Sequence, residues 1–259
     1  MLFFFGLSLV GLALFLTARR RGFFKRPEAW QIIIPPPLIW GGFFLYFALA
    51  FFMSFLTWIP GQLRELLLQL TLIISLVFLT GLHLKKTGLK KLLGLKEPDL
   101  LKKILTGILS WFVIFPAIFF FSEIVDSLLS RLHLPLPDQV AVSYVKTALK
   151  EPFLFALALV EVVFFTPFIE EFLFRALLQN FLKNHLPRLA AILGSSLVFA
   201  LFHFAPQQGW ANLTIILALF LLSLALGFLY EKQKTLFGAI ALHAAFNLFT
   251  ILHLLFFLK

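Results

Sequence analysis

The stretch LTIILALFLLSLALGFLY, Leu213–Tyr230, carries no charged side chain. A transmembrane helix needs about 20 mostly apolar residues, whereas a helix on the surface of a soluble domain keeps one polar face. This stretch has no such face along its length. It therefore predicts a helix that crosses a lipid bilayer.

The composition of the whole chain also indicates a membrane protein. Hydrophobic residues make up 61% of the 259 residues and charged residues only 13%, against roughly 45–50% and about 25% in soluble domains. The 36 phenylalanines exceed what a soluble core of this size can cover. A soluble domain, a disordered chain and a disulfide scaffold are excluded, and the lack of cysteine excludes a thiolate nucleophile and Cys-ligated metals.

About eight segments have the length and apolar character of spanning helices. They are Met1–Ala18, Leu38–Ile59, Leu66–Leu84, Ile104–Leu128, Pro152–Ile169, Ala190–Phe204, Leu213–Tyr230 and Leu236–Leu258. Three arginines follow the first segment, whereas a signal peptide carries its positive charge before the apolar stretch, so we interpret this segment as a retained anchor. The predicted fold class is an all-α, polytopic transmembrane helical bundle.

The distribution of basic residues predicts the orientation of the bundle. Inner loops of membrane proteins are enriched in Lys and Arg. With the N-terminus outside, the inner segments hold 17 of the 22 Lys and Arg residues. These segments are Arg19–Trp30, His83–Lys103, Glu170–Arg188 and Glu231–Thr235. We therefore expect both termini outside, and we attribute the formal charge of +10 to topology and lipid headgroups, with no nucleic-acid partner.

We divide the chain into two regions of one integral membrane unit. Residues 1–103 form an N-terminal membrane region with about three spans and a basic inner loop, and residues 104–259 form a core with about five spans. Within the first region, Lys85–Lys103 is interpreted as a solvated inner loop, and an amphipathic interfacial segment is the alternative.

Charged side chains within apolar spans are costly and usually functional. Glu161 lies in the fifth span, and Glu170, Glu171 and Arg175 follow it. Residues four apart are neighbours on a helix, so Arg175 and Glu171 are expected to form an ion pair. Glu170 lies about 100° further round the helix and is left free to act. Pro167 is expected to kink or break the helix there and give water a route in.

Two further polar sets lie in the C-terminal half. His203 follows Phe199 by four residues, and Asn247 follows His243 by four, so each pair lies on one helix face. A carboxylate that takes a proton from water, two imidazoles and an amide donor would suit a hydrolytic site. Each feature also has a structural interpretation: a lone His as an interhelical hydrogen-bond partner, the Glu171–Arg175 pair as an internal strut, and Glu161 as a structural or lining residue.

Taken in order, Glu170-Glu171-x-x-x-Arg175, Phe199-x-x-x-His203 and His243-x-x-x-Asn247 resemble the CPBP family of intramembrane proteases. This family contains the type II CAAX prenyl endopeptidases and the bacteriocin-processing and self-immunity proteins. The residues from Gly227 to His243 are also similar to the stretch that leads into the second His motif of the family. The resemblance extends roughly from Glu151 to Thr250 and does not include the first three spans.

The resemblance implies a role for each motif residue. Glu170 would activate water, and Glu171 with Arg175 would hold and tune the site. His203 and His243 would complete the cluster. Asn247 would help to form the oxyanion hole, and Phe199 would pack beside the site as a candidate substrate contact. It also implies a multi-pass protein of a bacterial or archaeal membrane.

A metal cofactor is not expected. Two His and two Glu are able to hold zinc, but the positive charge of Arg175 beside them disfavours a cation. The family is also generally regarded as glutamate-dependent. No His-Glu-x-x-His motif is present, and Asp99, Asp126 and Asp138 are not arranged as an aspartyl pair.

The predicted function is an intramembrane endopeptidase that cuts a membrane-bound or lipid-anchored protein or peptide by glutamate-activated water. One alternative is a non-proteolytic membrane scaffold or bacteriocin-immunity-type protein with the same fold. A second is a proton-coupled transporter that uses Glu161, Glu170 and Glu171 as a relay. A transporter would show inverted-repeat symmetry, whereas the acids cluster in one half of the chain.

Overall fold

The computed structural model describes residues 32–257, and these residues form helices and connecting loops without a β-strand. The predicted first span Met1–Ala18, and with it the predicted position of the N-terminus, lies outside the described residues. The all-α class predicted from the sequence is confirmed.

Six helices are long and apolar enough to cross a membrane. They are α2 (Pro36–Ser54), the first part of α3 (Gly61–Leu93), α4 (Leu100–Arg131), the composite helix Pro152–Lys183, α10 (Ala211–Gln233) and α11 (Leu236–Phe257). A seventh apolar helix, α9 (Arg188–Leu201), has only 14 residues. Two short elements complete the described chain, α5 (Val140–Ala148) and the 3₁₀ turn Pro206–Gln208. Seven of the eight predicted spans thus correspond to observed helices, and the chain is an integral, multi-pass membrane protein.

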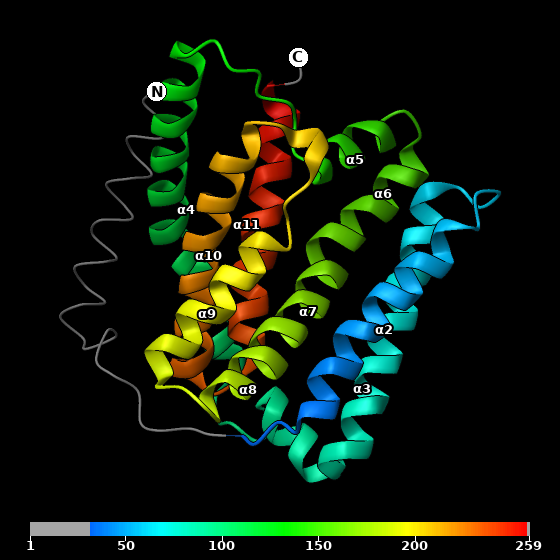
Figure 1. Ribbon diagram of the computed structural model, residues 1–259, viewed down its shortest axis with the longest axis vertical. Coiled ribbons are helices and arrows are strands. Elements are labelled where there is room, and N and C mark those ends of the chain that lie inside the picture. Colours follow the sequence, from blue (N-terminus) through cyan, green and yellow to red (C-terminus); the bar gives the residue numbers. More distant parts are fainter. Residues whose placement is uncertain (1–31, 258–259) are drawn as a thin grey trace.

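Successive apolar helices run in opposite directions through the bundle (Figure 1). The start of α2, the end of α3 and the start of α4 meet at one end of the molecule. The connection from α8 (Asn180–Lys183) to α9 and the connection from α10 to α11 lie at the same end. This end contains the described basic segments that were assigned to the inner side, except for the first turns of Glu170–Arg188. We therefore call it the inner end, following the excess of Lys and Arg.

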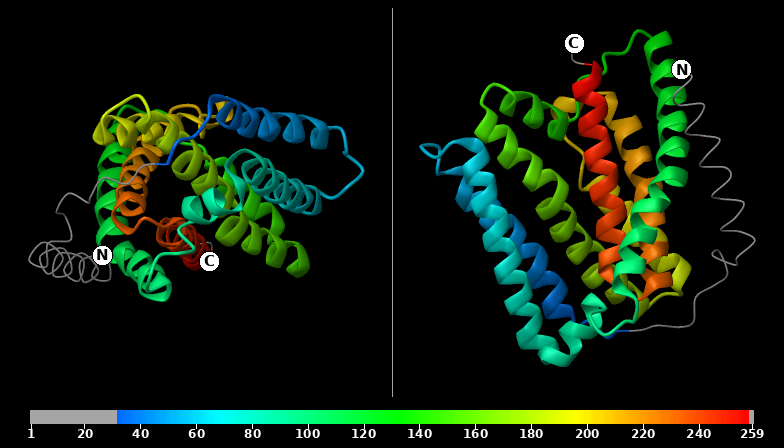
Figure 2. Two further views of the ribbon diagram at one scale, coloured as in Figure 1. Left: turned by 90° about the horizontal axis from the view of Figure 1, so that it is seen from below. Right: turned by 180° about the vertical axis from the view of Figure 1, so that it is seen from behind.

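The composite helix Pro152–Lys183 lies between two groups of helices (Figures 1 and 2). One group contains α4, α9, α10 and α11, which pack against one another, and the other is the α2–α3 hairpin. The hairpin contacts the composite helix along α6 (Pro152–Val160) and along its later turns. A Cβ atom added to Gly42 would lie 3.1 Å from Leu177, so α2 approaches this helix closely.

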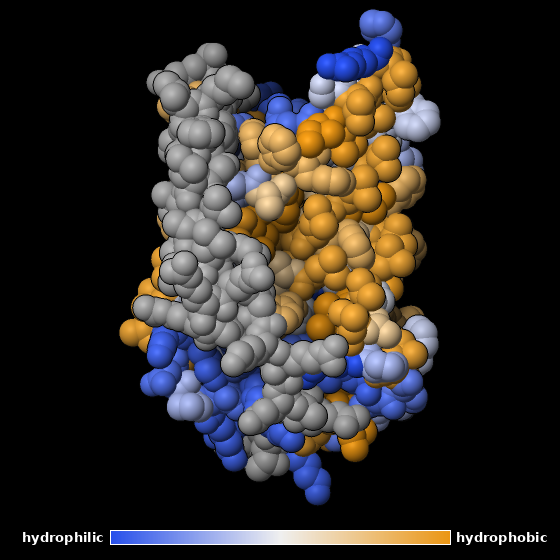
Figure 3. All heavy atoms as spheres, turned by 90° about the vertical axis from the view of Figure 1, so that its left-hand side faces the viewer, coloured by the Kyte–Doolittle hydropathy of each residue, from blue (hydrophilic) through white to orange (hydrophobic). Residues whose placement is uncertain are grey.

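Phenylalanines cover much of the surface between the two polar ends. Phe44, Phe51, Phe120 and Phe153 are each about 70% exposed, and an apolar band separates hydrophilic ends (Figure 3). In a bilayer, these side chains contact lipid tails, which favour apolar groups as a protein core does. The high phenylalanine content therefore serves the lipid-facing surface as well as the interior.

The structure corrects the predicted end of the fifth span. The helix does not stop at Ile169 but continues to Lys183, so Glu170, Glu171 and Arg175 lie within the membrane-spanning helix and not in an inner loop. Pro167 also does not break it. The chain instead widens into a π-helical turn, η1 (Glu161–Phe165), after which the N–H of Thr166 bonds the carbonyl of Glu161 five residues back. Such turns absorb a proline without ending the helix and are frequent at functional sites.

A largely irregular segment follows the short helix α9. The chain rises from Leu201 to the start of α10, and the 3₁₀ turn Pro206–Gln208 is its one regular element (Figure 1). The Asn212 amide accepts a bond from the N–H of Ala205 at 3.1 Å and donates to its carbonyl at 2.7 Å. The Gln208 amide donates to the carbonyl of His203 at 3.2 Å. These two side chains thus satisfy peptide groups that no helix satisfies.

Candidate active site

The composite helix presents two adjacent carboxylates in different environments. Glu170 and Glu171 end α7 (Thr166–Glu171), and a second π-helical stretch, η2 (Phe172–Gln179), follows them. The Glu171 side chain is completely buried, whereas that of Glu170 is 15% exposed. The two neighbours therefore point to different surroundings, as the 100° step of a helix predicts.

Glu171 is held by a basic partner on each oxygen. Arg175 Nε donates to Oε2 at 2.9 Å, and His243 Nδ1 lies 2.9 Å from Oε1. The ion pair predicted from the spacing of four residues is thus present, and its members are completely buried. Because a buried carboxylate needs partners of this kind, Glu171 is committed to holding Arg175 and His243 in place.

Glu170 faces the Nε2 atoms of two imidazole rings, those of His203 and His243. His203 Nε2 lies 3.5 Å from Glu170 Oε1, and His243 Nε2 lies 3.7 Å from Oε2. His203 follows the end of α9 and His243 lies in α11, so three segments far apart in sequence meet here. These separations are slightly longer than a direct hydrogen bond and lie within the range of an ion pair.

The Nδ1 atom of each imidazole has its own acceptor. His203 Nδ1 lies 2.9 Å from the carbonyl oxygen of Phe199, and His243 Nδ1 faces Glu171. Both acceptors favour a proton on Nδ1, an assignment inferred from the hydrogen-bond network. The Nε2 atoms are then left to exchange protons with Glu170 or with a group between them.

Phe199 lies at the centre of this cluster. Its ring centroid is 4.8 Å from that of His203 and 5.9 Å from that of His243. The guanidinium carbon of Arg175 lies 4.8 Å from the same ring, a distance at which a cation is attracted to an aromatic face. The ring is completely buried, so it packs beside the imidazoles and spaces them.

Three buried polar atoms of the cluster have no hydrogen-bond partner among the described residues. They are Glu170 Oε2 and both terminal nitrogens of Arg175. Buried polar groups are normally satisfied, and exceptions point to a functional site or to a bound water or ion. A carboxylate oxygen and two cationic donors are thus available beside the imidazoles for groups that the protein itself does not supply.

Asn247, the remaining predicted residue, has a different contact. Its Nδ2 atom donates to the carbonyl of Val162 at 2.8 Å, in the first π-helical turn. The structure therefore brings together Glu170, Glu171, Arg175, Phe199, His203 and His243, and it places Asn247 against the backbone one turn beyond His243. The amide has a second N–H that this bond does not use.

A second set of polar residues lies further along the same helix, toward the outer end. Tyr144 of α5 donates a hydrogen bond to Glu161, which is completely buried. Burial, together with the bond to Glu161 and its charge, raises the pKa of Tyr144 above its ordinary value, so the phenol stays protonated and donates. Sequence reasoning named Glu161 as a lining residue but missed Tyr144, because one tyrosine in a polar loop region gives no signal.

Two residues of α3 extend this outer set. Gln69 donates to Thr166 Oγ1 at 3.1 Å and is 3.4 Å from Glu65 Oε1. Glu65 lies one helical turn before Gln69, and Glu161 one turn before Thr166, so the two carboxylates lie at the same level on adjacent helices. The four-residue spacing of Glu65 and Gln69 at the start of an apolar span is a sequence signal for this set.

No group of three or more His, Asp or Glu residues is placed to hold a metal ion in the part of the chain that the structure describes. Within the cluster, Arg175 is hydrogen-bonded to Glu171 and directed over Phe199. A second cation there would meet this fixed positive charge.

Together, the fold and the cluster define a class: a polytopic α-helical membrane protein with a polar, partly accessible carboxylate–imidazole site inside the bundle. Residues 152–249 match the family model of type II CAAX prenyl endopeptidase Rce1-like. This segment includes every residue of the predicted site, and its match supports the CAAX protease family. Helices α2–α5 lie outside the matched residues. No curated protein and no solved structure matches the chain.

Proposed function

We propose that the chain is an intramembrane endopeptidase in which Glu170 activates a water molecule. The observation that carries this proposal is that Glu170 alone of the two adjacent carboxylates is accessible and lies between the Nε2 atoms of His203 and His243. The family match, to a group of proteases, supports hydrolysis of a peptide bond.

The chemistry follows from the positions of the acids and bases. Glu170 removes a proton from water, and the resulting hydroxide oxygen attacks the carbonyl carbon of the scissile bond. The carbonyl oxygen becomes an oxyanion, which takes hydrogen bonds from protonated His203 or from the second N–H of Asn247. Glu170 then gives the proton that it took from water to the leaving nitrogen, and the C–N bond breaks. No acyl-enzyme forms, because the cluster contains no nucleophilic hydroxyl or thiol.

Glu171 and Arg175 act as positioning residues in this scheme. Glu171 fixes the His243 ring through Nδ1, and Arg175 balances its charge in a completely buried place. The terminal nitrogens of Arg175 add positive potential beside Glu170. This potential stabilises the negative charge that develops during attack.

We further propose a membrane-bound or lipid-anchored peptide as substrate. The cluster lies inside a bundle with an apolar outer surface, so a peptide tethered to the bilayer reaches it by lateral diffusion. The family name includes CAAX prenyl endopeptidases, which makes a prenylated C-terminal peptide the first candidate. The proposed chemistry uses protein groups and water without a metal.

The decisive experiment is Glu170→Gln in the purified full-length protein, tested on a fluorogenic prenylated CAAX peptide and on an unprenylated membrane peptide. We expect cleavage to fall by at least about 10³-fold, because general-base catalysis contributes about 10²–10⁴-fold. Thermal stability should be retained because the change is nearly isosteric. Glu151→Gln, at an exposed carboxylate before α6, is the matched control and should cleave at the normal rate.

Two outcomes would contradict the proposal. If Glu170→Gln keeps its activity, then another group activates the water. If the folded parent protein cleaves no membrane peptide of either kind, then a non-proteolytic scaffold or immunity role with the same fold is favoured.

A further inference from the structure

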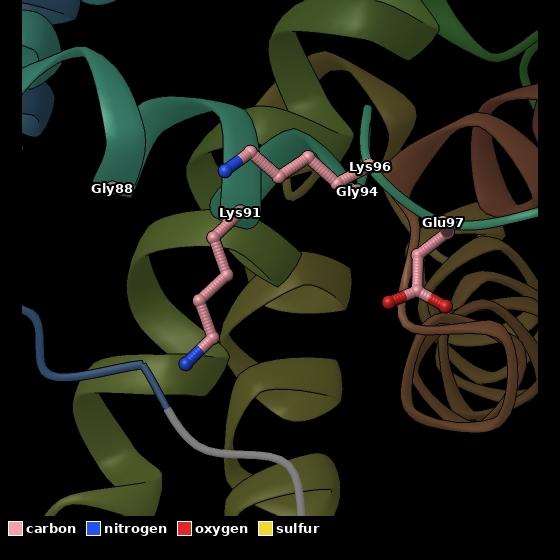
Figure 4. A pocket seen from close by; sticks show the side chains of 5 residues that line it. All are labelled: Gly88, Lys91, Gly94, Lys96 and Glu97. Carbon is pink, nitrogen blue, oxygen red and sulfur yellow. The ribbon is translucent and has the colours of Figure 1, made fainter.

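Helices α2 and α3 lie outside the residues matched by the family, so the match assigns no role to their side chains. A cavity of about 350 Å³ at the end of α3 is lined by Gly88, Lys91, Gly94, Lys96 and Glu97. The amines of Lys91 and Lys96 point in different directions there (Figure 4), and Glu97 forms an ion pair with Lys103 at 2.9 Å. These groups do not converge on one ligand, whereas a side chain of α2 does lie at the candidate active site.

Tyr46 of α2 lies at the level of Glu170. The helix α2 and the composite helix run in opposite directions, and a Cβ atom added to Gly42 would lie 3.5 Å from Leu173. Tyr46 is one turn further outward on the same face of α2, and Glu170 is about one turn further outward along the composite helix. The charge of Glu170 accordingly acts on the Tyr46 phenol, and it does so more strongly than the charge of Glu65 in α3.

Aromatic packing fixes the position of the Tyr46 ring. Its centroid lies 5.1 Å from that of Phe202, the residue before His203. Two further rings of α2, those of Phe43 and Phe47, have centroids 6.3 and 5.6 Å from that of Phe202. Aromatic pairs at such distances stabilise one another beyond the area that they bury. Tyr46 is therefore held against the segment that carries one of the two imidazoles of the cluster.

The hydroxyl of Tyr46 has no hydrogen-bond partner among residues 32–257, and these residues do not enclose it. A phenol is able to donate one hydrogen bond. This hydroxyl is acted on by the charge of Glu170 without bonding it directly. A substrate group placed between the two would meet a donor on one side and the water-activating carboxylate on the other.

We propose that the Tyr46 hydroxyl donates a hydrogen bond to the carbonyl oxygen of the scissile bond. This role rests on the endopeptidase function proposed above. As the activated water attacks, the carbonyl oxygen becomes negative, and the hydrogen bond strengthens while the phenol keeps its proton. Tyr46 is then a catalytic residue that is supplied by a helix outside the family match.

Tyr46→Phe in the purified full-length protein tests this role, because it removes the hydroxyl and keeps the ring against Phe202. We expect kcat for peptide cleavage to fall by about 10²-fold, as for the loss of one oxyanion donor. KM and thermal stability should stay near those of the parent, since the bond forms only during the reaction. Tyr144→Phe is the matched control, because it removes the same group from a tyrosine of the outer set. It should lower thermal stability and leave kcat near that of the parent.

A spectroscopic measurement checks the position of the phenol without peptide cleavage. The chain contains three tyrosines, so labelling with fluorotyrosine gives three fluorine NMR signals, and Tyr46→Phe identifies the signal of Tyr46. Glu170→Gln should shift this signal because it removes a nearby charge. Glu151→Gln, at the exposed carboxylate before α6, should leave it in place.

The outcomes separate this role from the proposed function. If Glu170→Gln is inactive but Tyr46→Phe keeps the kcat of the parent, then the role of Tyr46 is wrong and the proposed function stands. A Tyr46 signal that does not shift in Glu170→Gln also overturns the role, whatever the cleavage assay gives. If the parent protein cleaves no membrane peptide, then the proposed function is overturned and the role of Tyr46 with it.

Discussion

The inner and outer parts of the composite helix Pro152–Lys183 each contain buried carboxylates, but the partners of these carboxylates differ. In the inner set, Glu171 is paired with Arg175 and His243, and Glu170 faces two imidazoles. In the outer set, Glu161 has a phenol partner in Tyr144, and Glu65 has an amide partner in Gln69. Neither outer carboxylate forms an ion pair with a described residue.

The difference shows what a carboxylate in a membrane needs in order to do chemistry. A buried charge without a cation is costly, so a carboxylate with only neutral donors is held mainly by hydrogen bonds. Cationic partners stabilise the ionised form, which is the form that accepts a proton from water. On this ground, we propose catalysis for the inner set and packing between helices for the outer set.

Removing the cation from the inner set should have the largest effect. Arg175→Met leaves the Glu171 carboxylate buried without its charge partner, which costs about 3–5 kcal/mol of folding free energy. We expect a marked loss of thermal stability and loss of cleavage. Lys146→Met, in the partly exposed outer pair with Asp138, is the matched control and should cost less than about 1 kcal/mol. If both variants lose the same folding free energy, then the buried Arg175 contributes no more to stability than the partly exposed Lys146.

The double variant Arg175→Met, Glu171→Leu separates folding from catalysis. Replacing both members of a buried ion pair by apolar residues of similar volume is often neutral or stabilising. We expect stability close to that of the parent protein and no recovery of peptide cleavage. Recovered cleavage would mean that the pair is only a strut.

Asn247 lies between the inner and outer sets. Replacing it therefore tests whether the catalytic site extends as far as this residue. If its amide binds the oxyanion, Asn247→Ala should lower kcat by about 10²–10³-fold with little change in KM. Asn184→Ala is the matched control, since Asn184 also donates to a backbone carbonyl, that of Ile34 at 3.2 Å. A loss of stability in Asn247→Ala without a specific loss of kcat would limit Asn247 to holding α11 against Val162.

Changes in the outer set should have smaller effects on cleavage. Glu161→Gln keeps an acceptor for Tyr144, so we expect cleavage within about threefold of normal and stability within about 1 kcal/mol, the range of one hydrogen bond. Tyr144→Phe should reduce stability by about 1–3 kcal/mol, because it leaves a buried acceptor unpaired. Cleavage assays and thermal melts of both variants give the comparison. If Glu161→Gln is as inactive as Glu170→Gln, the outer carboxylate takes part in catalysis.

Chelation should have no effect. If the inner set works with protons alone, exhaustive treatment with EDTA and 1,10-phenanthroline leaves the cleavage rate unchanged, and added zinc does not raise it. A rate that is lost on chelation and restored by zinc would replace Glu170 as the activator of water with a metal ion.

Much of the fold could be predicted from the sequence, because lipid imposes simple requirements. A span must be apolar and about 20 residues long, and inner loops must be basic, so the positions and alternating directions of α2–α4, α10 and α11 follow from local patterns. The end of the fifth span could not be predicted in this way. The charges of Glu170, Glu171 and Arg175 predict the start of a loop. Inside the bundle, however, ion-pair and imidazole partners stabilise these charges.

The candidate site was predictable where its contacts lie on one helix. The Glu171–Arg175 pair follows from spacing alone. Contacts between helices depend on how the helices dock, which no local pattern contains. For this reason the bond from Asn247 to Val162 and the bond from Tyr144 to Glu161 were both missed. The π-helical turn at Glu161–Phe165 was also missed, because Pro167 predicts a disturbance but not its form.

The short helix α9 has a consequence for the bilayer itself. Its 14 residues give a length of about 21 Å at 1.5 Å per residue, whereas the hydrocarbon core is about 30 Å thick. The remaining distance is crossed by the irregular chain that Asn212 and Gln208 support. Local thinning of the bilayer is one way in which a membrane accommodates a short apolar helix. We therefore expect water to have a short path through this region to His203, just past the last turn of α9, and to Glu170.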